Sequence, residues 1–302
     1  MPCNICPRCC SAGRNTSGPG YCRSGNTCMV ASVCRHTGEE PAISGRRGIC
    51  NVFFAHCNMQ CVYCQNHEIS RNHSYNRLWE MTPQEVAERI LQVLPSCENR
   101  VGFVTASHYI PQVIEIINLV RMSGADPVFV YNSNGYDSPG MLRLLEGKID
   151  IYLPDFKYSD EALARQLSGA PDYPAIALKA VKEMYRQKGS LLLLDEESGL
   201  AESGLIIRHL VLPGLVGQSE EVLRIIAEEI STGVHISLMA QYYPPFVIDN
   251  FPELNRSLYP REYGQVLDAF HKAGFYKGWI QSLESTRHYR PHFDTEQPFQ
   301  EE

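Results

Sequence analysis

The sequence lacks an excess of positive charge and lacks long apolar runs. Its 27 lysines and arginines stand against 34 aspartates and glutamates, for a net charge of -7, whereas proteins that bind nucleic acid through its phosphates are usually basic. No apolar run approaches the ~18 residues of a membrane-spanning helix. The first residues, MPCNICPRCC, lack the basic-then-apolar start of a secretory signal. These absences disfavour nucleic acid and membrane as partners and indicate a cytoplasmic protein.

Cysteine is nearly absent from most of the chain. Eleven of the twelve cysteines lie in the first 64 residues, and the other is Cys97. In a reducing compartment such a cluster indicates metal binding or redox chemistry more than disulfides. Residues 1–45 also lack a periodic apolar pattern, so this stretch cannot form a core by side-chain burial alone. We therefore interpret it as a Cys-rich extension that metal organises.

From about Val52 the chain has an ordinary globular composition and alternates between strand-like and helix-like segments. Of the whole chain, 44% is hydrophobic and 20% is charged. Uniformly apolar strands separated by helices are typical of buried parallel strands joined by crossovers. The pattern predicts a βα barrel or an open doubly wound sheet, with an extra hairpin strand within 189–204. The predicted strands are 51–55, 101–106, 127–132, 150–156, 204–214 and 234–239, and the predicted helices are 82–94, 110–122, 138–147, 159–169, 173–189 and 219–231.

Polar residues collect where the predicted strands end. In parallel architectures the loops at the carboxyl ends of the strands form the working face, so we expect these side chains to meet there. In chain order they are Cys57, Cys61, Cys64, Thr105, Ser107, His108, Asn132, Asn134, Asp155, Lys157, Arg208, Gln241 and Tyr242.

The three cysteines of this set follow a C-x3-C-x2-C pattern. Thiolates are the usual ligands of iron-sulfur clusters, and three within eight residues can hold three irons of a 4Fe-4S cube. The fourth iron then keeps an open position, which distinguishes a catalytic metal site from a structural one. The alternative is a zinc site that takes its fourth ligand from His56, His67 or a distant cysteine.

This pattern, with Tyr63 just before the third cysteine, resembles the motif of the radical S-adenosylmethionine superfamily. The wider chain resembles the branch of the pyruvate formate-lyase activating enzymes. The resemblance implies a TIM-like partial (β/α)6 barrel at residues 46–285, after the extension 1–45 and before a tail, 286–302, that we expect to pack on the surface. The segments that carry the resemblance are GEEPAISG, CNMQCVYCQNHEIS, VTASHYIPQV, DIYLPDFKY, RHLVLPG and FPELNR.

The resemblance also implies a reaction. The amine and carboxylate of S-adenosylmethionine chelate the open iron, and an electron cleaves the sulfonium to give a 5'-deoxyadenosyl radical that abstracts hydrogen. An electron donor such as ferredoxin or flavodoxin and a glycyl-radical partner protein are the implied partners. The alternatives are a radical enzyme acting on a small molecule, and a non-enzymatic iron-sulfur or zinc electron carrier.

Individual cofactor contacts follow from the same resemblance. Arg208 matches the arginine of an Arg-x-x-x-x-Pro-Gly stretch, and its guanidinium suits the methionyl carboxylate. Asp155 and Lys157 match an Asp-x-Lys pair near the cofactor, although such a pair can also be a simple ion pair at a strand end.

Other contacts replace residues that relatives have. Where many relatives have a Gly-Gly-Glu stretch for the methionyl amine, this chain offers Thr105, Ser107 and His108. Gln241 or Tyr242 stands where activating enzymes have a histidine. The two asparagines of NSNG, Asn132 and Asn134, are candidates for ribose contacts or for the turn itself.

The extension offers a second set of ligands. Cys3, Cys6, Cys10 and Cys22 have the C-x2-C-x3-C...C arrangement seen in close relatives, with Cys9 as a substitute. Four thiolates close a site, and both zinc and an auxiliary 4Fe-4S cluster accept four sulfurs. Cys28, Cys34 and Cys50 have two interpretations. They are solitary thiols, or they form a further metal site together with Cys9.

Overall fold

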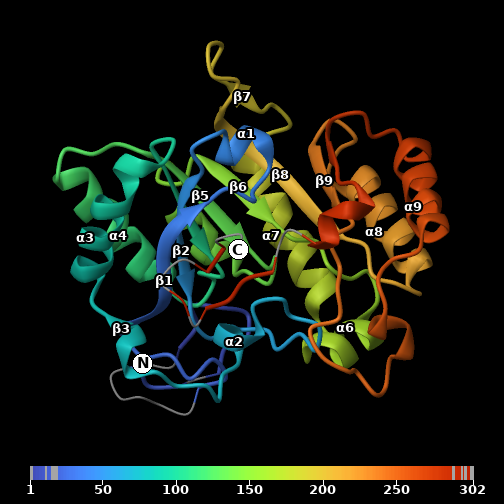
Figure 1. Cartoon of the computed structure of the whole chain (residues 1–302), viewed down its shortest axis with the longest axis horizontal. Coiled ribbons are helices and arrows are strands. Elements are labelled where there is room, and N and C mark those ends of the chain that lie inside the picture. Colours follow the sequence, from blue (N-terminus) through green and yellow to red (C-terminus); the bar gives the residue numbers. More distant parts are fainter. Residues whose placement is uncertain are drawn as a thin grey trace.

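The computed structural model describes residues 3–10, 12–14, 20–287, 290–293, 295 and 298–299. Its centre is one curved sheet with the strand order β10-β9-β8-β6-β5-β4-β2-β1-β3, and β7 pairs with β8 beside it (Figure 1). The sheet ends at β10 and β3, and in the described part of the chain no pairing joins these ends. The fold is therefore an open partial barrel, as predicted.

The parallel strands of the barrel agree with the predicted ones. Each register is parallel from β2 through to β10, which is what apolar strands joined by helices predict. The short last strand was not predicted. The strands are β2 (Ile49–Phe54), β4 (Arg100–Val104), β5 (Val128–Ser133), β6 (Ile151–Pro154), β8 (Ala201–Leu210), β9 (His235–Met239) and β10 (Gly278–Ile280).

Helices follow the strands and cover the outside of the sheet, with α3 and α4 on one side and α8 and α9 on the other (Figure 1). The first long helix starts with a capping box: Thr82 Oγ1 accepts from the Glu85 amide, and the Glu85 carboxylate accepts from the Thr82 amide. The helices are α2 (His67–Ser70), α3 (Pro83–Val93), α4 (Ile110–Met122), α5 (Pro139–Leu144), α6 (Glu161–Ser168), α7 (Tyr173–Lys188), α8 (Val216–Glu229) and α9 (Pro260–Lys272), with 3-10 turns at Arg77–Trp79, Leu94–Ser96, Pro252–Asn255 and Leu283–Arg287.

The boundary expected at residue 45 does not match the structure. Strand β1 (Cys28–His36) pairs antiparallel with β2 and also with the short β3 (Glu80–Met81). Residues 28–45 therefore belong to the barrel, and the Cys-rich extension is confined to the residues before them. The sequence did not predict this strand, because the Gly- and Ser-rich residues that precede it dominate the composition of residues 1–45.

A short helix, α1 (Pro41–Ser44), closes the amino end of the barrel. Its Ala42 and Ile43 pack in one apolar cluster with the first residues of three strands, Ile49, Ile151 and Ala201. In Figure 1, α1 lies at the end of the molecule opposite α2 and the N-terminus. Solvent and ligands therefore reach the barrel interior from the carboxyl ends of the strands.

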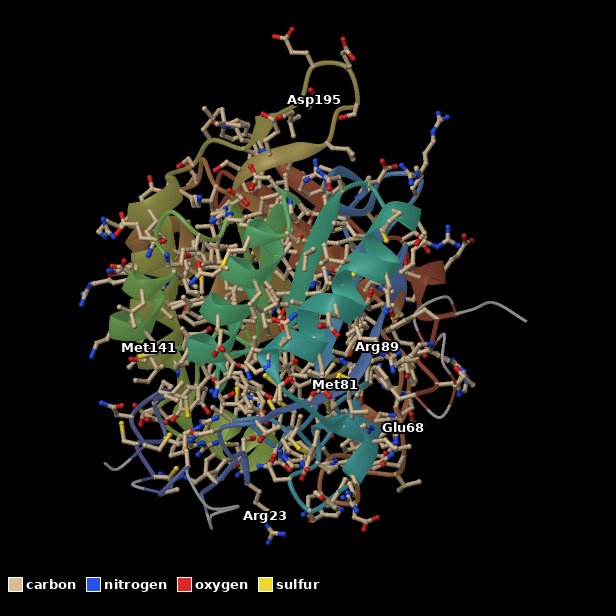
Figure 2. The ribbon with its side chains drawn as sticks, turned by 90° about the vertical axis from the view of Figure 1, so that its left-hand side faces the viewer. Arg23, Glu68, Met81, Arg89, Met141 and Asp195 are labelled. Carbon is tan, nitrogen blue, oxygen red and sulfur yellow. The ribbon has the colours of Figure 1, made fainter. Side chains whose placement is uncertain are left out.

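The predicted extra hairpin is present. Strand β7 (Leu193–Leu194) pairs antiparallel with β8, and Figure 2 shows Asp195 at the tip of this projecting hairpin, far from Arg23 and Glu68. Within the described residues, none of the helices combines the length and the apolar character that crossing a membrane requires.

Candidate functional site

A cavity lies at the carboxyl ends of the strands. Its empty volume, counted out to its open mouth, is about 1180 Å³. Most of the residues predicted from the strand ends line it, together with Tyr63. The predicted residues in its wall are Cys57, Cys61, Tyr63, Cys64, Thr105, Asn132, Asn134, Asp155, Lys157, Arg208 and Gln241.

The three cysteines of the C-x3-C-x2-C loop lie together in this wall, and each sulfur accepts a hydrogen bond. A thiolate is a better acceptor than a thiol, so these donors favour the charged form that binds metal. The donors to Cys57, Cys61 and Cys64 are Asn134 Nδ2 at 3.3 Å, Ser168 Oγ at 2.9 Å and Ser70 Oγ at 3.3 Å.

These residues fit an iron-sulfur cluster better than a single ion. Burial raises the pKa of Cys57 and of Cys61, so a bound metal is needed to hold them as thiolates. Among the residues described, no three His, Cys, Asp or Glu side chains are arranged to hold one ion. In a cluster each thiolate binds a different iron. His56, an alternative zinc ligand, has its Nε2 2.8 Å from the carbonyl oxygen of Ser74.

A chain of hydroxyl groups ends at the Cys61 sulfur. Because Ser168 donates to Cys61, its oxygen accepts from Tyr158 at 2.6 Å, and Tyr158 in turn accepts from Tyr63 at 2.6 Å. Tyr63 is thus the far end of a buried relay that supports one cluster ligand. The sequence marked Tyr63 only by its place in the motif.

The predicted pair Asp155 and Lys157 forms an ion pair beside the cysteines. Lys157 Nζ lies 2.5 Å from Asp155 Oδ2. Burial lowers the pKa of Lys157, but attraction to Asp155 and to the Cys61 thiolate outweighs it and raises the pKa to about 12. Lys157 is therefore a fixed positive charge next to the sulfurs.

Arg208 lines the cavity but is bound to two carboxylates that the sequence analysis missed. Arg208 Nη2 lies 2.7 Å from Glu39 Oε2, and Arg208 Nε lies 2.8 Å from Glu40 Oε1. The three side chains are 13%, 6% and 4% exposed. Arg208 Nη2 and Nε, which we expect from the sequence to face the carboxylate of the cofactor, thus bind carboxylates of the chain itself.

Glu39 is held by the strands around it. Its Oε1 accepts from Asn51 Nδ2 at 2.9 Å and from Asn132 Nδ2 at 3.3 Å. Burial disfavours the charged form of Glu39, but Arg208 outweighs it and lowers the pKa. Gly102 makes room for this network, because a Cβ there would lie 2.0 Å from Asn51 Oδ1.

The remaining predicted contacts divide into two groups. Thr105 lines the cavity with a left-handed backbone, φ 60°, and Gln241 lines it while accepting from Gln281 Nε2 at 2.7 Å. Ser107 and His108 are fully buried and do not line the cavity. Burial lowers the pKa of His108 to about 3, so it is neutral.

The two asparagines of NSNG have protein partners. Asn132 donates to Glu39, as above. Asn134 donates to Cys57 and to Asn58, while its Oδ1 accepts from the Tyr136 amide at 2.9 Å. Asn134 therefore forms the turn and also supports a cluster ligand, a combination that the sequence did not suggest.

The C-terminal tail is more than a surface-packed terminus. Pro291 and Phe299 line the cavity. The Phe299 ring lies 4.2 Å from the His36 ring and 5.2 Å from the Phe53 ring, centre to centre. The described tail residues thus supply part of the wall where the barrel is open.

The extension brings its cysteines together. Cys6 and Cys22 are buried. Burial and then the nearby sulfurs of Cys22, Cys3 and Cys10 raise the pKa of Cys6 to about 12. Cys3, Cys10 and Cys22 thus lie within electrostatic reach of Cys6, but the four side chains, all among the described residues, are not arranged as ligands of one ion, and the metal itself stays a prediction.

The other cysteines of the N-terminal region are not all apart. Cys28, Cys34 and Cys50 are buried in β1 and β2, whereas Cys9 is exposed. Cys34 and Cys50 lie on adjacent strands and near Cys97, so the choice between solitary thiols and a further site stays a prediction. All twelve cysteines are free.

The extension docks directly on the cysteine loop. Arg8 donates to the carbonyl oxygens of Asn58 at 2.8 Å and Gly169 at 2.7 Å. Asn72 donates to the Tyr21 carbonyl at 2.8 Å and accepts from the Cys57 amide at 3.0 Å. Hydrogen bonds therefore link the Cys-rich extension to the loop that carries Cys57, Cys61 and Cys64.

Comparison with known proteins places these features in a family context. Residues 51–198 match the model of the radical SAM superfamily. The chain is 28% identical over 275 residues to the uncharacterized protein MJ0674 of Methanocaldococcus jannaschii, a match that covers 89% of this chain and 74% of that protein.

Solved structures show a similar fold at low identity. Streptococcus suis SuiB bound to precursor peptide SuiA superposes with a TM-score of 0.50 at 12% identity, covering 77% of this chain and 49% of that chain. Native anSMEcpe with bound AdoMet superposes with a TM-score of 0.46 at 14% identity, covering 77% and 59%. The match thus covers less than two thirds of either structure.

Proposed function

We propose that this chain, whose residues 51–198 match the model of the radical SAM superfamily, is an enzyme that cleaves S-adenosylmethionine reductively. The single observation that best supports this is the cavity wall in which Cys57, Cys61 and Cys64 each accept a hydrogen bond. A reduced 4Fe-4S cluster bound there would supply the electron for reductive cleavage of S-adenosylmethionine, the chemistry from which hydrogen abstraction follows.

The chain's own residues would bind and orient the reactants. The three thiolates would hold the cluster, and Lys157 would offset part of their negative charge. The relay that ends at Ser168 would fix the Cys61 sulfur. The apolar residues of the wall, among them Phe53, Met59 and Leu210, would exclude water, which strengthens these electrostatic interactions.

The test is anaerobic reconstitution with iron and sulfide, followed by assay of 5'-deoxyadenosine. We expect the wild-type chain to form it with dithionite and S-adenosylmethionine, and Cys61→Ala to form none while staying folded. Cys97→Ala, which removes a cysteine outside the cavity, is the matched control. Full activity of Cys61→Ala would refute the proposal.

Electron paramagnetic resonance separates this function from plain electron transfer. An enzyme of this class binds S-adenosylmethionine at the cluster, so the cofactor should change the signal of the reduced cluster. An iron-sulfur or zinc electron carrier would show no such change.

For the substrate we keep two classes. In the first class, as in the activating enzymes that the sequence resembles, the substrate would be a glycine of a partner protein. The electron donor would be a cytoplasmic ferredoxin or flavodoxin. The tail favours the second class, a small molecule, because Pro291 and Phe299 lie in the wall where a partner's loop would have to enter. Anaerobic pull-down of a glycyl-radical protein would support the first class.

We further propose a second metal site at Cys3, Cys6, Cys10 and Cys22, with an auxiliary 4Fe-4S cluster preferred over zinc. The support is that the other three sulfurs lie within electrostatic reach of Cys6, in a segment docked on the cysteine loop. The test is to replace Cys57, Cys61 and Cys64 together by Ala and to measure iron, sulfide and zinc after reconstitution. About four irons per chain are expected; one zinc without iron would identify a zinc site, and neither metal would refute both.

A further inference from the structure

A charged network lies inside the barrel, between α1 and the cysteine loop. We call it the barrel floor and define it by the residues His36, Glu39, Glu40, Asn51, Asn132 and Arg208. Its members come from β1, β2, β5 and β8 and from the turn before α1, so five parts of the chain converge on it.

The barrel floor carries one negative charge in excess. Glu39 and Glu40 share the single guanidinium of Arg208. Burial lowers the pKa of His36, which keeps its imidazole neutral. Lys157, which lines the same cavity, is already paired with Asp155. A buried charge without a counterion is costly, so a binding cation would be favoured here.

Two polar atoms of the barrel floor lack partners. Glu40 Oε2 and His36 Nδ1 are buried and have no hydrogen-bond partner among the residues described. Glu40 and His36 are 6% and 8% exposed. His36 and Glu39 both line the cavity, whereas Glu40 does not, so a ligand that enters the cavity meets Glu39 and His36 first, with Glu40 beside them on Arg208. Buried polar atoms without partners are rare and often mark a ligand or water site.

One end of the barrel floor, at Asn51, is set back from the cysteines. Asn51, which holds Glu39, precedes the end of β2 by three residues, and the cysteine loop begins beyond that end. At about 3.3 Å per residue this is roughly 10 Å of strand. Asn132 and Arg208 lie one and two residues before the ends of β5 and β8, so the barrel floor extends from Asn51 up to the level of the cysteine loop.

We propose that the barrel floor is the substrate subsite of the enzyme proposed above, and that it binds the ammonium group of a small molecule distinct from S-adenosylmethionine. An ammonium group supplies the missing positive charge and three donors, which Glu39 and the free oxygen of Glu40 can accept. A carboxylate would be repelled by the excess charge, and an alcohol would leave that charge unpaired.

The first test uses the reconstituted full chain and needs no variant. Isothermal titration calorimetry under anaerobic conditions compares n-butylammonium, 1-butanol and butyrate as probes. We expect butylammonium to bind at least tenfold more tightly than either of the others. Equal binding of butylammonium and butanol would overturn the proposal.

The second test removes the charge. Glu40→Gln should weaken butylammonium binding at least tenfold, and Glu39→Gln should do the same if Glu40→Gln fails to fold. Glu88→Gln, an exposed carboxylate on α3, is the matched control and should bind like wild type. Unchanged affinity in a folded Glu40→Gln protein would overturn the proposal.

Two further arms identify the source of the amine. At equilibrium, saturating S-adenosylmethionine should leave the affinity for butylammonium unchanged, whereas competition between the two would assign the ammonium site to the cofactor and overturn the proposal. Cys61→Ala, which should lose 5'-deoxyadenosine formation, should still bind butylammonium. The subsite and the proposed function can therefore fail independently.

Discussion

Ser168 controls how much negative charge the Cys61 sulfur can carry. Its hydroxyl lies 2.9 Å from that sulfur and is itself held by Tyr158. Hydrogen bonds to the sulfurs are one of the factors that set the potential of an iron-sulfur cluster, because they stabilise the reduced, more negative state.

We therefore expect Ser168→Ala to lower the reduction potential of the reconstituted cluster by on the order of tens of millivolts. A redox titration monitored by electron paramagnetic resonance measures this. Ser96→Ala, at an exposed hydroxyl that donates to the Val93 carbonyl, is the control. The same potential in all three proteins would exclude a role for this hydrogen bond.

Arg208 is a structural residue in addition to any cofactor role. Arg208→Lys replaces two separate guanidinium contacts by one point charge and leaves a buried carboxylate poorly paired. We expect it to lower the free energy of unfolding by about 2 kcal/mol, as measured by urea denaturation.

An exposed ion pair provides the comparison for Arg208. Lys182 and Glu229 are 44% and 50% exposed, so Lys182→Met should cost less than about 1 kcal/mol. Similar losses of unfolding free energy in both variants would mean that burial does not increase the stabilisation by the Arg208 ion pairs.

The sequence located most of the cavity residues but not their partners. Cys57, Asp155 and Arg208 were found because parallel strands place their carboxyl ends together. Glu39 and Glu40 contact Arg208 across 169 and 168 residues, and no local pattern reports such a contact. The usable signal was a polar residue, Asn51, inside an otherwise apolar strand.

At the scale of the strand, Gly102 decides whether β4 and β2 can pair as they do. The two strands place Asn51 opposite Gly102, and a Cβ at residue 102 would lie 2.0 Å from Asn51 Oδ1. We expect Gly102→Ala to lower the free energy of unfolding by about 1–3 kcal/mol through overpacking.

The matched control for Gly102 is another glycine with open space. Gly264 lies in α9 with nothing within 4 Å of the position of a Cβ. Gly264→Ala should raise stability by about 0.5–1 kcal/mol, because alanine favours the helix. Thermal unfolding of the two variants should shift in opposite directions, and a shift in the same direction would contradict this account.

The elements themselves were predictable where their pattern was long and regular. Helix α4 begins and ends at the predicted residues, 110 and 122. Strand β1 was missed because its neighbours in sequence are loop-like, and β10 because three residues carry too little pattern. The open barrel depends on contacts between distant strands, which the sequence indicated only through the family resemblance.

For the molecule as a whole, buried neutral histidines lower the free energy of unfolding at acidic pH. His209 Nδ1 donates to the Phe156 carbonyl at 2.7 Å, so its Nε2 accepts from Ser219 at 2.8 Å. Burial lowers the pKa of His209 from 6.5 to about 4. The folded state therefore binds fewer protons than the unfolded state between these values, and stability falls as the pH falls through this range.

We expect His209 to account for a loss of about 2 kcal/mol in the free energy of unfolding between pH 7.5 and pH 5. Urea denaturation at both values measures the loss. His209→Gln should be less stable at pH 7.5 but should lose about 2 kcal/mol less on acidification. An equal loss in both proteins would assign the acid sensitivity to other groups.

The placement of α1 has a kinetic consequence. Because it covers the amino ends of the strands, a molecule that binds at the barrel floor must pass the cysteine loop on its way in and again on its way out. Anything held at that loop stands in this path. We therefore expect compulsory order: the amine arrives first, S-adenosylmethionine follows and confines it, and excess S-adenosylmethionine slows turnover by occupying the route before the amine has entered.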